Sequence, residues 1–276
     1  MNGGLTEFVA QHPDLLVLTG AGLSTASGIG DYRGEDGAWK RRPPVELREY
    51  LRFEHARRRY WSRSLAGWPH FAAAEPNAGH RALARLHRAQ RLIGTVTQNV
   101  DGLHARAGHE GVIELHGRLS DVICLQCDDR FSRAAVQQWL LAANPSFAAR
   151  IAELRADGDA ELETDDLDRF VVPNCPTCAG LLKPGVVFFG ESVPRAAVEQ
   201  VYALLARASA LLLVGTSVMV YSGFRFCRAA HEQGKPIVSI NRGVTRADAM
   251  LAFKIDGDCA HVLDDLAETL DLCFDA

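Results

Sequence analysis

The sequence predicts an α/β protein in which a doubly wound parallel sheet carries a small zinc-ribbon module and a helical insertion. Three observations support this fold class. Short apolar runs alternate with amphipathic helical stretches, two Cys-x-x-Cys pairs stand far apart, and an Arg- and aromatic-rich segment interrupts the alternation. The chain has 276 residues, 47% of them hydrophobic and 23% charged, which allows a large core and argues against disorder.

The predicted strands are short apolar runs. Residues 15–19 (Leu-Leu-Val-Leu-Thr) form a continuous run that is typical of a buried parallel strand, and Gly20-Ala21-Gly22 follows it directly. Further strands of the same sheet are expected at residues 92–97, 112–115, 186–189, 211–214 and 237–240.

Helical stretches separate the later strands. Residues 194–208 place Val198, Val201 and Leu205 on one face, and residues 224–233 are followed by Gly234. Strands separated by helices of this length form a parallel sheet that is covered on both faces. We therefore expect a Rossmann-like domain made of residues 1–39, 91–117 and 186–276, a helical insertion at 40–90 and a zinc-binding module at 118–185.

Four of the seven cysteines form two Cys-x-x-Cys pairs, Cys124 with Cys127 and Cys175 with Cys178. Each pair can aim two thiolates at one point, and two pairs complete the tetrahedral site that a structural zinc ion prefers. Disulfides are the alternative interpretation, but no export signal is visible to support them. A thioredoxin-like redox site would need only one pair. We expect one structural zinc ion per chain, without an open position for catalysis.

Charge and hydropathy argue against two classes of protein. The 30 basic and 34 acidic residues give a net charge of −4, which disfavours a protein whose main partner is a nucleic-acid backbone. No apolar run approaches the about 20 residues that span a bilayer, and the first residues show no secretory signal. We expect a cytoplasmic monomer with no membrane partner and no specific nucleic-acid partner.

The glycine-rich turn after the first strand suits close approach of the backbone to a pyrophosphate. The hydride-transfer fingerprint Gly-x-Gly-x-x-Gly fails, however, because Thr25 stands at its third glycine position. Residues 24–34 contain three glycines and an Asp-Tyr-Arg triplet, a composition that suits a loop folding over a ligand. The turn therefore indicates a dinucleotide but not a dehydrogenase.

Polar residues follow other predicted strands at their carboxyl ends. They are Thr97-Gln98-Asn99-Val100-Asp101, His116-Gly117, Gly215-Thr216-Ser217 and Asn241-Arg242. Ligands of open α/β sheets bind at the carboxyl ends of strands, so these residues should converge on one crevice. Any single member could instead be structural, as Asn99 would be if it capped a helix. Their recurrence at five strand ends, the glycine turn included, favours a binding crevice.

Several segments carry a family resemblance when taken in chain order. They are Gly20-Ala21-Gly22-x-Ser24, residues 28–34, residues 97–104 (TQNVDGLH), residues 114–117 (ELHG), the two Cys-x-x-Cys pairs, residues 183–191 (KPGVVFFGE) and residues 215–217 (GTS). Together they resemble the sirtuins, which are NAD-dependent protein lysine deacylases. The resemblance extends from about residue 15 to about residue 265.

Other segments are similar to the class II branch, which includes the fourth human sirtuin, a mitochondrial enzyme. They are residues 59–63 (RYWSR), 67–69 (GWP), 157–159 (DGD) and 220–223 (VYSG). No Arg- and Ser-rich transit extension is visible, so the chain resembles a bacterial cytosolic member more closely.

The resemblance implies a reaction that releases nicotinamide and O-acyl-ADP-ribose. The acyl oxygen of the substrate lysine attacks C1′ of the nicotinamide ribose, and a histidine then deprotonates a ribose hydroxyl. His116 stands at the position of this base, and an imidazole suits such a role at neutral pH. Asn99 and Asp101 stand where the family holds the ribose and the nicotinamide carboxamide.

The resemblance also implies the remaining NAD contacts. Gly20, Ala21, Gly22, Ser24 and Thr216 would cradle the phosphates, Gln98 and Ser217 would contact ribose hydroxyls, Arg33 would bridge the loop to the diphosphate, and Asn241 and Cys259 would lie on the adenosine side. Further contacts are expected from Asp31, Tyr32, Val100, Gly215 and Arg242. Gly30 stands where the family usually has proline, and Tyr32 where many members have phenylalanine. We therefore expect a cofactor loop that is less restrained before NAD binds.

Acyl-lysine proteins or peptides are the implied substrates. The segment Val186, Val187, Phe188, Phe189 and Gly190 would pair with an extended peptide by β-augmentation. Tyr60 and Arg63 have the Tyr-x-x-Arg spacing of the sirtuin branch that removes acidic acyl groups, where a phenol and a guanidinium receive a carboxylate. Arg63 could instead belong to a basic surface run, and the class II segments favour branched or long acyl chains.

Two other functions remain open from the sequence. A protein ADP-ribosyltransferase could use the same site and cofactor. A zinc-ribbon nucleic-acid-binding protein would explain the cysteines but would leave His116, Asn99 and Asp101 without a role.

Overall fold

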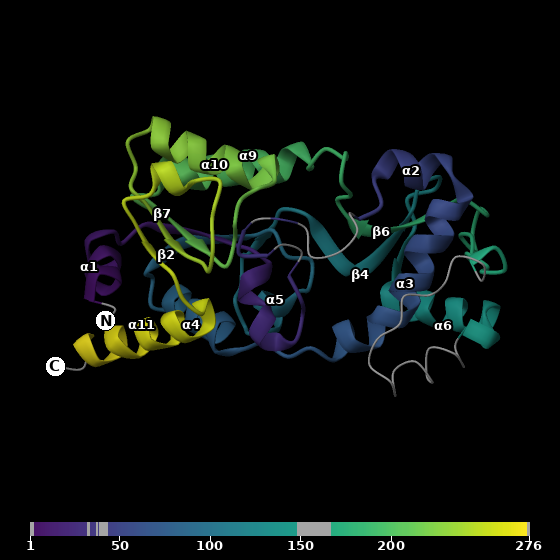
Figure 1. The fold of residues 1–276 in the computed structure, drawn as a ribbon, viewed down its shortest axis with the longest axis horizontal. Coiled ribbons are helices and arrows are strands. Elements are labelled where there is room, and N and C mark those ends of the chain that lie inside the picture. Colours follow the sequence, from purple (N-terminus) through teal and green to yellow (C-terminus); the bar gives the residue numbers. More distant parts are fainter. Residues whose placement is uncertain (1–2, 32–33, 37, 39–43, 148–166, 275–276) are drawn as a thin grey trace. The chain divides into compact units, whose positions relative to one another are not determined.

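The computed structural model describes residues 3–31, 34–36, 38, 44–147 and 167–274, with side chains as far as residue 270. The chain divides into two compact units (Figure 1). Unit 1 comprises Met1–Arg42, Ala74–His116 and Val193–Ala276, and unit 2 comprises Pro43–Ala73 and Gly117–Ser192.

A six-stranded parallel sheet forms the centre of unit 1. Its strands are β1 (Leu15–Thr19), β2 (Leu92–Thr97), β3 (Ile113–Glu114), β7 (Ala210–Val214), β8 (Ile237–Ile240) and β9 (Phe253–Ile255). They lie in the order β3-β2-β1-β7-β8-β9. From β1 the chain proceeds outward to β2 and β3, and it later returns to β7 on the other side of β1. The strand order therefore reverses between β1 and β7, which confirms the predicted doubly wound fold.

Helices cover both faces of this sheet (Figure 1). On one face pack α1 (Gly3–Gln11), α4 (Ala78–Arg88) and α11 (Cys259–Phe274), and on the other α9 (Arg195–Arg207) and α10 (Tyr221–Glu232). Alternate residues of β1 enter the two cores, Leu15 and Val17 the first, and Leu16 and Leu18 the second. Burial on both faces explains why β1 and β7 are continuous apolar runs in the sequence.

Short helices complete unit 1 at the carboxyl ends of its strands. The α-helix α5 (Leu103–Arg106) follows β2, and the 3₁₀ helices are η1 (Ala21–Leu23), η2 (Thr25–Ser27) and η3 (Asp248–Met250). Among the described residues, no helix combines the length and the apolarity needed to cross a membrane.

The described residues of unit 2 form a three-stranded antiparallel sheet and three helices. The sheet has the order β5-β4-β6, with β4 (Gly117–Cys124), β5 (Arg130–Ser132) and β6 (Leu182–Val186). The helices are α2 (Leu47–Arg52), α3 (Glu54–Ala73) and α6 (Arg133–Ala143). Trp61 donates its Nε1–H to the Tyr50 hydroxyl at 2.7 Å, and that hydroxyl donates to the carbonyl of Leu182 at 2.5 Å. These buried bonds tie the helical insertion to the ribbon sheet.

The prediction that residues 186–189 form a strand of the parallel sheet is wrong. Val186 ends β6, which pairs antiparallel with β4 in the register Cys124 to Leu182 and Gly117 to Val186. A short apolar run fits a parallel and an antiparallel strand equally well, and only the partner strand distinguishes them. The antiparallel pair β4 and β5 and the outer strand β9 have too little apolar character to be predicted from the sequence.

The two units also differ from the predicted domains. Residues 43–73 belong with residues 117–192, whereas α4, from the same predicted insertion, belongs to unit 1. The reason is packing, because Leu83 and Leu86 of α4 enter the core that α11 shares. An ion pair of 2.8 Å between Arg85 and Asp264 links the same two helices.

Three buried histidines lie together beside β1. His80, His104 and His109 are at most 3% exposed, with ring centroids 5.0 Å apart for the first pair and 5.6 Å for His104 and His109. His104 Nε2 is hydrogen-bonded to Thr19 Oγ1 at 3.0 Å. Burial lowers the pKa of His80 and of His109 to about 4 and holds the pKa of His104 well below 6.5.

These neutral histidines should make the stability of the protein depend on pH. Their pKa values are lower in the folded than in the unfolded chain, so their contribution is complete above about pH 6.5 and is lost as the pH falls toward 4. His80 and His109 should each remove about 2 kcal/mol from the free energy of unfolding by pH 5. Denaturant unfolding at several pH values should show a shallower decline for His109→Gln than for the parent. The exposed His231→Gln should keep the parent's slope, and an unchanged slope for His109→Gln would refute this explanation.

Candidate cofactor site and metal centre

Two glycine turns interlock at the carboxyl ends of β1 and β7. The Gly22 N–H donates to the Gly215 carbonyl at 2.8 Å, and the Gly20 N–H donates to the Val214 carbonyl at 3.0 Å. A Cβ on Gly22 would lie 2.9 Å from the Gly215 Cα, and a Cβ on Gly215, which has a φ of +56°, would lie 2.3 Å from the Leu23 nitrogen. Only glycine fits at these positions. The turns therefore present bare backbone at the point where the strand order reverses, which suits a pyrophosphate.

A chain of hydrogen bonds joins this turn to the loop after β2. Asn99 donates its Nδ2 to the Gly20 carbonyl at 2.9 Å and to Ser24 Oγ at 3.0 Å. Ser24 Oγ donates to Asp101 Oδ2 at 2.7 Å, and Asp101 Oδ1 accepts the N–H of Leu103 at the start of α5. The structure thus brings together Gly20, Ser24, Asn99 and Asp101, all of them predicted site residues.

Gln98 links β2 to the second glycine turn. Its Nε2 donates to Thr216 Oγ1 at 2.8 Å. A Cβ at position 223 would lie 2.5 Å from Gln98 Oε1, so α10 can lie this close to Gln98 only because residue 223 is glycine. The residue after this turn, Val218, has a φ of +44° although it is β-branched and 1% exposed. Such a conformation is strained for valine and persists where the surrounding structure enforces it.

His116 lies at the end of β3 with both ring nitrogens engaged. Nδ1 is 2.9 Å from the Gln98 carbonyl oxygen, and Nε2 is 2.8 Å from Ser222 Oγ. A carbonyl can only accept, so Nδ1 carries the proton in the neutral ring. Burial lowers the pKa of His116 below 6.5, while the Gln98 carbonyl raises it by a smaller amount. At neutral pH the ring is therefore uncharged, with its lone pair on Nε2.

The predicted adenosine-side residues gather around the same turns. Asn241 is 7% exposed and donates its Nδ2 to the Arg242 carbonyl at 2.7 Å. Cys259 Sγ lies 3.3 Å from the Gly22 carbonyl oxygen, and burial raises the pKa of this thiol to about 12, so it stays protonated. Arg242 forms a partly exposed ion pair of 3.6 Å with Asp258.

The remaining predicted residues are placed less closely. Asp31, Val100 and Ser217 are half-buried, and the Ser217 carbonyl accepts the N–H of Arg246 at 2.9 Å. Tyr32 and Arg33 lie outside the described residues, as do Asp157, Gly158 and Asp159. Tyr60, Arg63 and the segment 186–190 belong to unit 2.

Thr97, which was expected in the crevice, and two polar residues that were not, Asn77 and Ser222, support the site. Asn77 donates its Nδ2 to the Leu23 carbonyl at 2.7 Å, Thr97 Oγ1 accepts the Asn99 N–H at 3.1 Å, and Ser222 meets His116. Asn77 could have been found, because it caps α4 in a capping box with His80. Ser222 is 106 residues from His116, and no local pattern signals such a contact.

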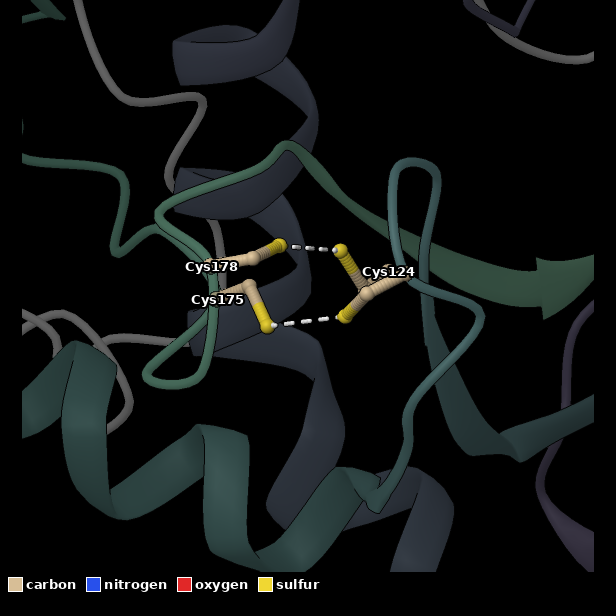
Figure 2. A group of neighbouring side chains, drawn as sticks. Cys124, Cys175 and Cys178 are labelled. Carbon is tan, nitrogen blue, oxygen red and sulfur yellow. Dashed lines mark hydrogen bonds between the residues drawn. The ribbon is translucent and has the colours of Figure 1, made fainter.

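The metal centre lies in unit 2, where the four predicted cysteines converge (Figure 2). Their sulfur atoms all lie within 4.8 Å of one another, with 3.5 Å between Cys124 and Cys178 and 3.7 Å between Cys127 and Cys175. A tetrahedron with zinc–sulfur distances of about 2.3 Å has edges of about 3.8 Å. A disulfide would need about 2.05 Å. The four thiols are free, and their arrangement fits a structural zinc ion.

Tight turns aim these thiols at one point. Asp128 and Ala179 directly follow the two pairs, and both have left-handed backbones, with φ of +60° and +59°. Gly180 is required beside the sulfurs, because its Cβ would lie 3.0 Å from the Cys124 Sγ and 3.1 Å from the Cys178 Sγ. Cys124 ends β4, so the centre is anchored in the antiparallel sheet.

Replacing Cys175 by serine should remove the zinc and destabilise unit 2. Binding of a structural metal supplies much of the folding free energy of a small ribbon, so we expect the melting temperature to fall by about 10 °C or more. Elemental analysis should find about one zinc per parent chain and almost none in the variant. Cys227→Ala is the matched control, because Cys227 is buried outside the cluster and should leave the zinc content unchanged. A metal-free parent protein with the same stability would contradict the assignment.

Comparisons with known proteins agree with the predicted family. The model of the Sir2 family matches residues 20–222. A protein of Bordetella bronchiseptica named NAD-dependent protein deacetylase is 53% identical over 94% of this chain and 94% of its own length. A protein of the same name from Xanthomonas axonopodis pv. citri is 51% identical over 94% of this chain and 88% of its own length. A Sir2 structure with a p53 peptide and NAD+ superposes with a TM-score of 0.79 at 25% identity, covering 99% of both chains. The chain therefore belongs to the Sir2 family.

Proposed function

We propose that this protein is an NAD-dependent protein lysine deacylase that releases nicotinamide and O-acyl-ADP-ribose. The observation that carries the proposal is the state of His116, a buried neutral histidine whose Nδ1–H is held by a carbonyl and whose Nε2 carries a lone pair. It stands in the same unit as the interlocked glycine turns and the Asn99–Ser24–Asp101 bonds. The names of the relatives support the same activity.

The residues around the turns fit NAD. When bound, NAD supplies the acceptor for the acyl group and nicotinamide as the leaving group. The backbone of Gly20 to Gly22 and the Thr216 hydroxyl would receive the phosphates, and Asn99 and Asp101 would orient the nicotinamide ribose and the carboxamide. His116 Nε2 would take the proton of a ribose hydroxyl.

Burial makes His116 a base that works at neutral and mildly acidic pH. Since its pKa lies below 6.5, the unprotonated form persists as the pH falls and is lost only below that lowered pKa. Deacylation should therefore keep its rate near pH 6.5, where an ordinary histidine would be half protonated.

The substrate peptide would pair with the segment 186–190 of unit 2. Lys183 Nζ donates to the Val186 carbonyl at 2.6 Å, and the Phe188 N–H donates to Glu191 Oε2 at 2.8 Å. An ion pair of 2.9 Å joins the buried Lys183 to the half-buried Glu191 and fixes this edge. Because peptide groups alternate along an extended chain, those of Val187 and Phe189 face the opposite edge. The Phe189 carbonyl there accepts the N–H of Leu47 at 2.9 Å, so we place the substrate strand at the peptide groups of Val187.

A panel of acyl-lysine peptides incubated with NAD tests the proposed function. We expect nicotinamide release that requires the acyl peptide, together with O-acyl-ADP-ribose detected by mass spectrometry. NAD labelled in its adenosine part separates this activity from ADP-ribosyl transfer, which would place the label on protein.

We also propose a cytoplasmic monomer without a nucleic-acid partner, consistent with the net charge of −4.

Replacing His116 by alanine should lower turnover about 100-fold or more, the scale of losing a general base. NAD binding, measured by calorimetry, should largely survive, because the contacts of the glycine turns do not involve this ring. The exposed His231→Ala serves as the control and should turn over at the parent's rate. Deacylation by His116→Ala at a near-normal rate would show that another group is the base.

The acyl preference can be tested at Arg63. Tyr60 lies in an aromatic cluster, with ring centroids 5.7 Å from Tyr50 and 5.2 Å from Phe188, and Arg63 is exposed three residues later on α3. If these two residues receive a carboxylate, Arg63→Met should lose about tenfold or more of the activity on succinyl and glutaryl peptides and keep the activity on acetyl peptides. Arg59→Met, also on α3 and paired with Glu49, is the control. Equal loss on all peptides, or a parent inactive on acidic acyl groups, would reject the idea.

A further inference from the structure

Ser222 is hydrogen-bonded to His116 Nε2, the nitrogen whose lone pair would accept a proton in the proposed reaction. Its Oγ is 2.8 Å from His116 Nε2, and it lies in the first turn of α10 with 9% of its surface exposed. The other nitrogen of the ring is held at 2.9 Å by the Gln98 carbonyl. The ring is thus fixed from two sides, by the loop after β2 and by α10.

The chemistry of the two partners decides where the hydrogens lie. The carbonyl oxygen of Gln98 has no hydrogen to donate, so Nδ1 must donate to it. In the neutral ring Nε2 is then a pure acceptor, and the Ser222 hydroxyl donates to it. A serine hydroxyl can also accept, so after Nε2 takes up a proton the same Oγ can receive the new Nε2–H.

We propose that Ser222 is a positioning residue for His116: the Gln98 carbonyl sets the Nδ1–H tautomer, and the Ser222 hydroxyl holds the ring and supports Nε2 both before and after proton transfer. The inference rests on the proposed function, in which His116 is the base. During the transfer, rotation about the Cα–Cβ bond of Ser222 moves its hydroxyl away from Nε2, so that the lone pair is open to the proton. The proton of the ribose hydroxyl goes to Nε2, and Ser222 neither gains nor loses a proton.

Imidazole nitrogen NMR on the cofactor-free protein tests this inference without activity. In the parent at neutral pH, we expect His116 to carry its proton on Nδ1. Removal of the hydroxyl in Ser222→Ala should lower the pKa of His116 by about half a unit to one unit. The reason is that a hydrogen bond from the charged ring is about twice as strong as one to the neutral ring. Ser222→Thr, which keeps a hydroxyl, should restore the pKa toward the parent value.

Ser239→Ala is the matched control. Ser239 is a buried serine of β8 in the same unit, and its hydroxyl has no hydrogen-bond partner among the described residues. Its removal should leave the tautomer and the pKa of His116 unchanged. A proton on Nε2 in the parent, or the same His116 pKa in Ser222→Ala as in the parent, would overturn the inference. The parent measurement decides even if the alanine variant fails to fold.

Kinetics separate this role from a general effect on the fold. Ser222→Ala should lower kcat about tenfold, keep KM for NAD within about twofold, and move the acid limb of the pH profile to lower pH, in step with His116. A parallel loss of NAD binding would show that Ser222 only supports the fold. If His116→Ala kept its turnover while the NMR result held, the proposed base would be wrong and the Ser222 contact would stand.

Discussion

The site of unit 1 depends on the contact of two backbone turns that leaves no room for a side chain. Gly22 and Gly215 approach so closely that a Cβ on either would meet backbone atoms at 2.9 Å or less. This contact is possible only where β1 and β7 are parallel neighbours and the strand order reverses. The topology therefore creates a surface of bare peptide groups. The two turns are also the fixed points to which the side chains of Asn99 and Gln98 are hydrogen-bonded, directly or through Thr216.

Burial keeps several ionisable groups around this contact uncharged. Burial keeps His116, His104 and His80 neutral, and it keeps the Cys259 thiol protonated beside the Gly22 carbonyl. A neutral His104 can bond to Thr19, the last residue of β1, without placing a charge under the turn. The same burial that keeps His116 neutral, as the proposed base must be, thus makes the stability of unit 1 sensitive to acid.

Much of the fold and of the candidate site could be predicted from the sequence, because the sequence patterns that indicate them are local. The continuous apolar run of β1, the glycines after it and the two Cys-x-x-Cys pairs each depend on a few consecutive residues whose geometry has few alternatives. Contacts between distant residues could not be predicted in this way. The apolar run from Val186 to Phe189 fits a strand of the parallel sheet, and only the pairing of Val186 with β4 shows otherwise. Ser222 meets His116 only because the fold brings α10 to the residues that follow β3. The helical insertion was recognised as helical, yet α4 and the pair α2 and α3 pack into different cores.

Calorimetric titration of NAD into Gly22→Ala and Gly30→Ala tests most directly whether NAD rests on the interlocked glycine turns, as we propose. Gly30 lies in the loop that follows, and apart from its chain neighbours no described residue has an atom within 4 Å of the position a Cβ would occupy. Gly30→Ala should bind NAD as tightly as the parent or more tightly, because alanine restrains the loop before NAD binds. Gly22→Ala should lose measurable binding while keeping its zinc. Equal affinity of Gly22→Ala and the parent for NAD would show that NAD does not rest on these turns.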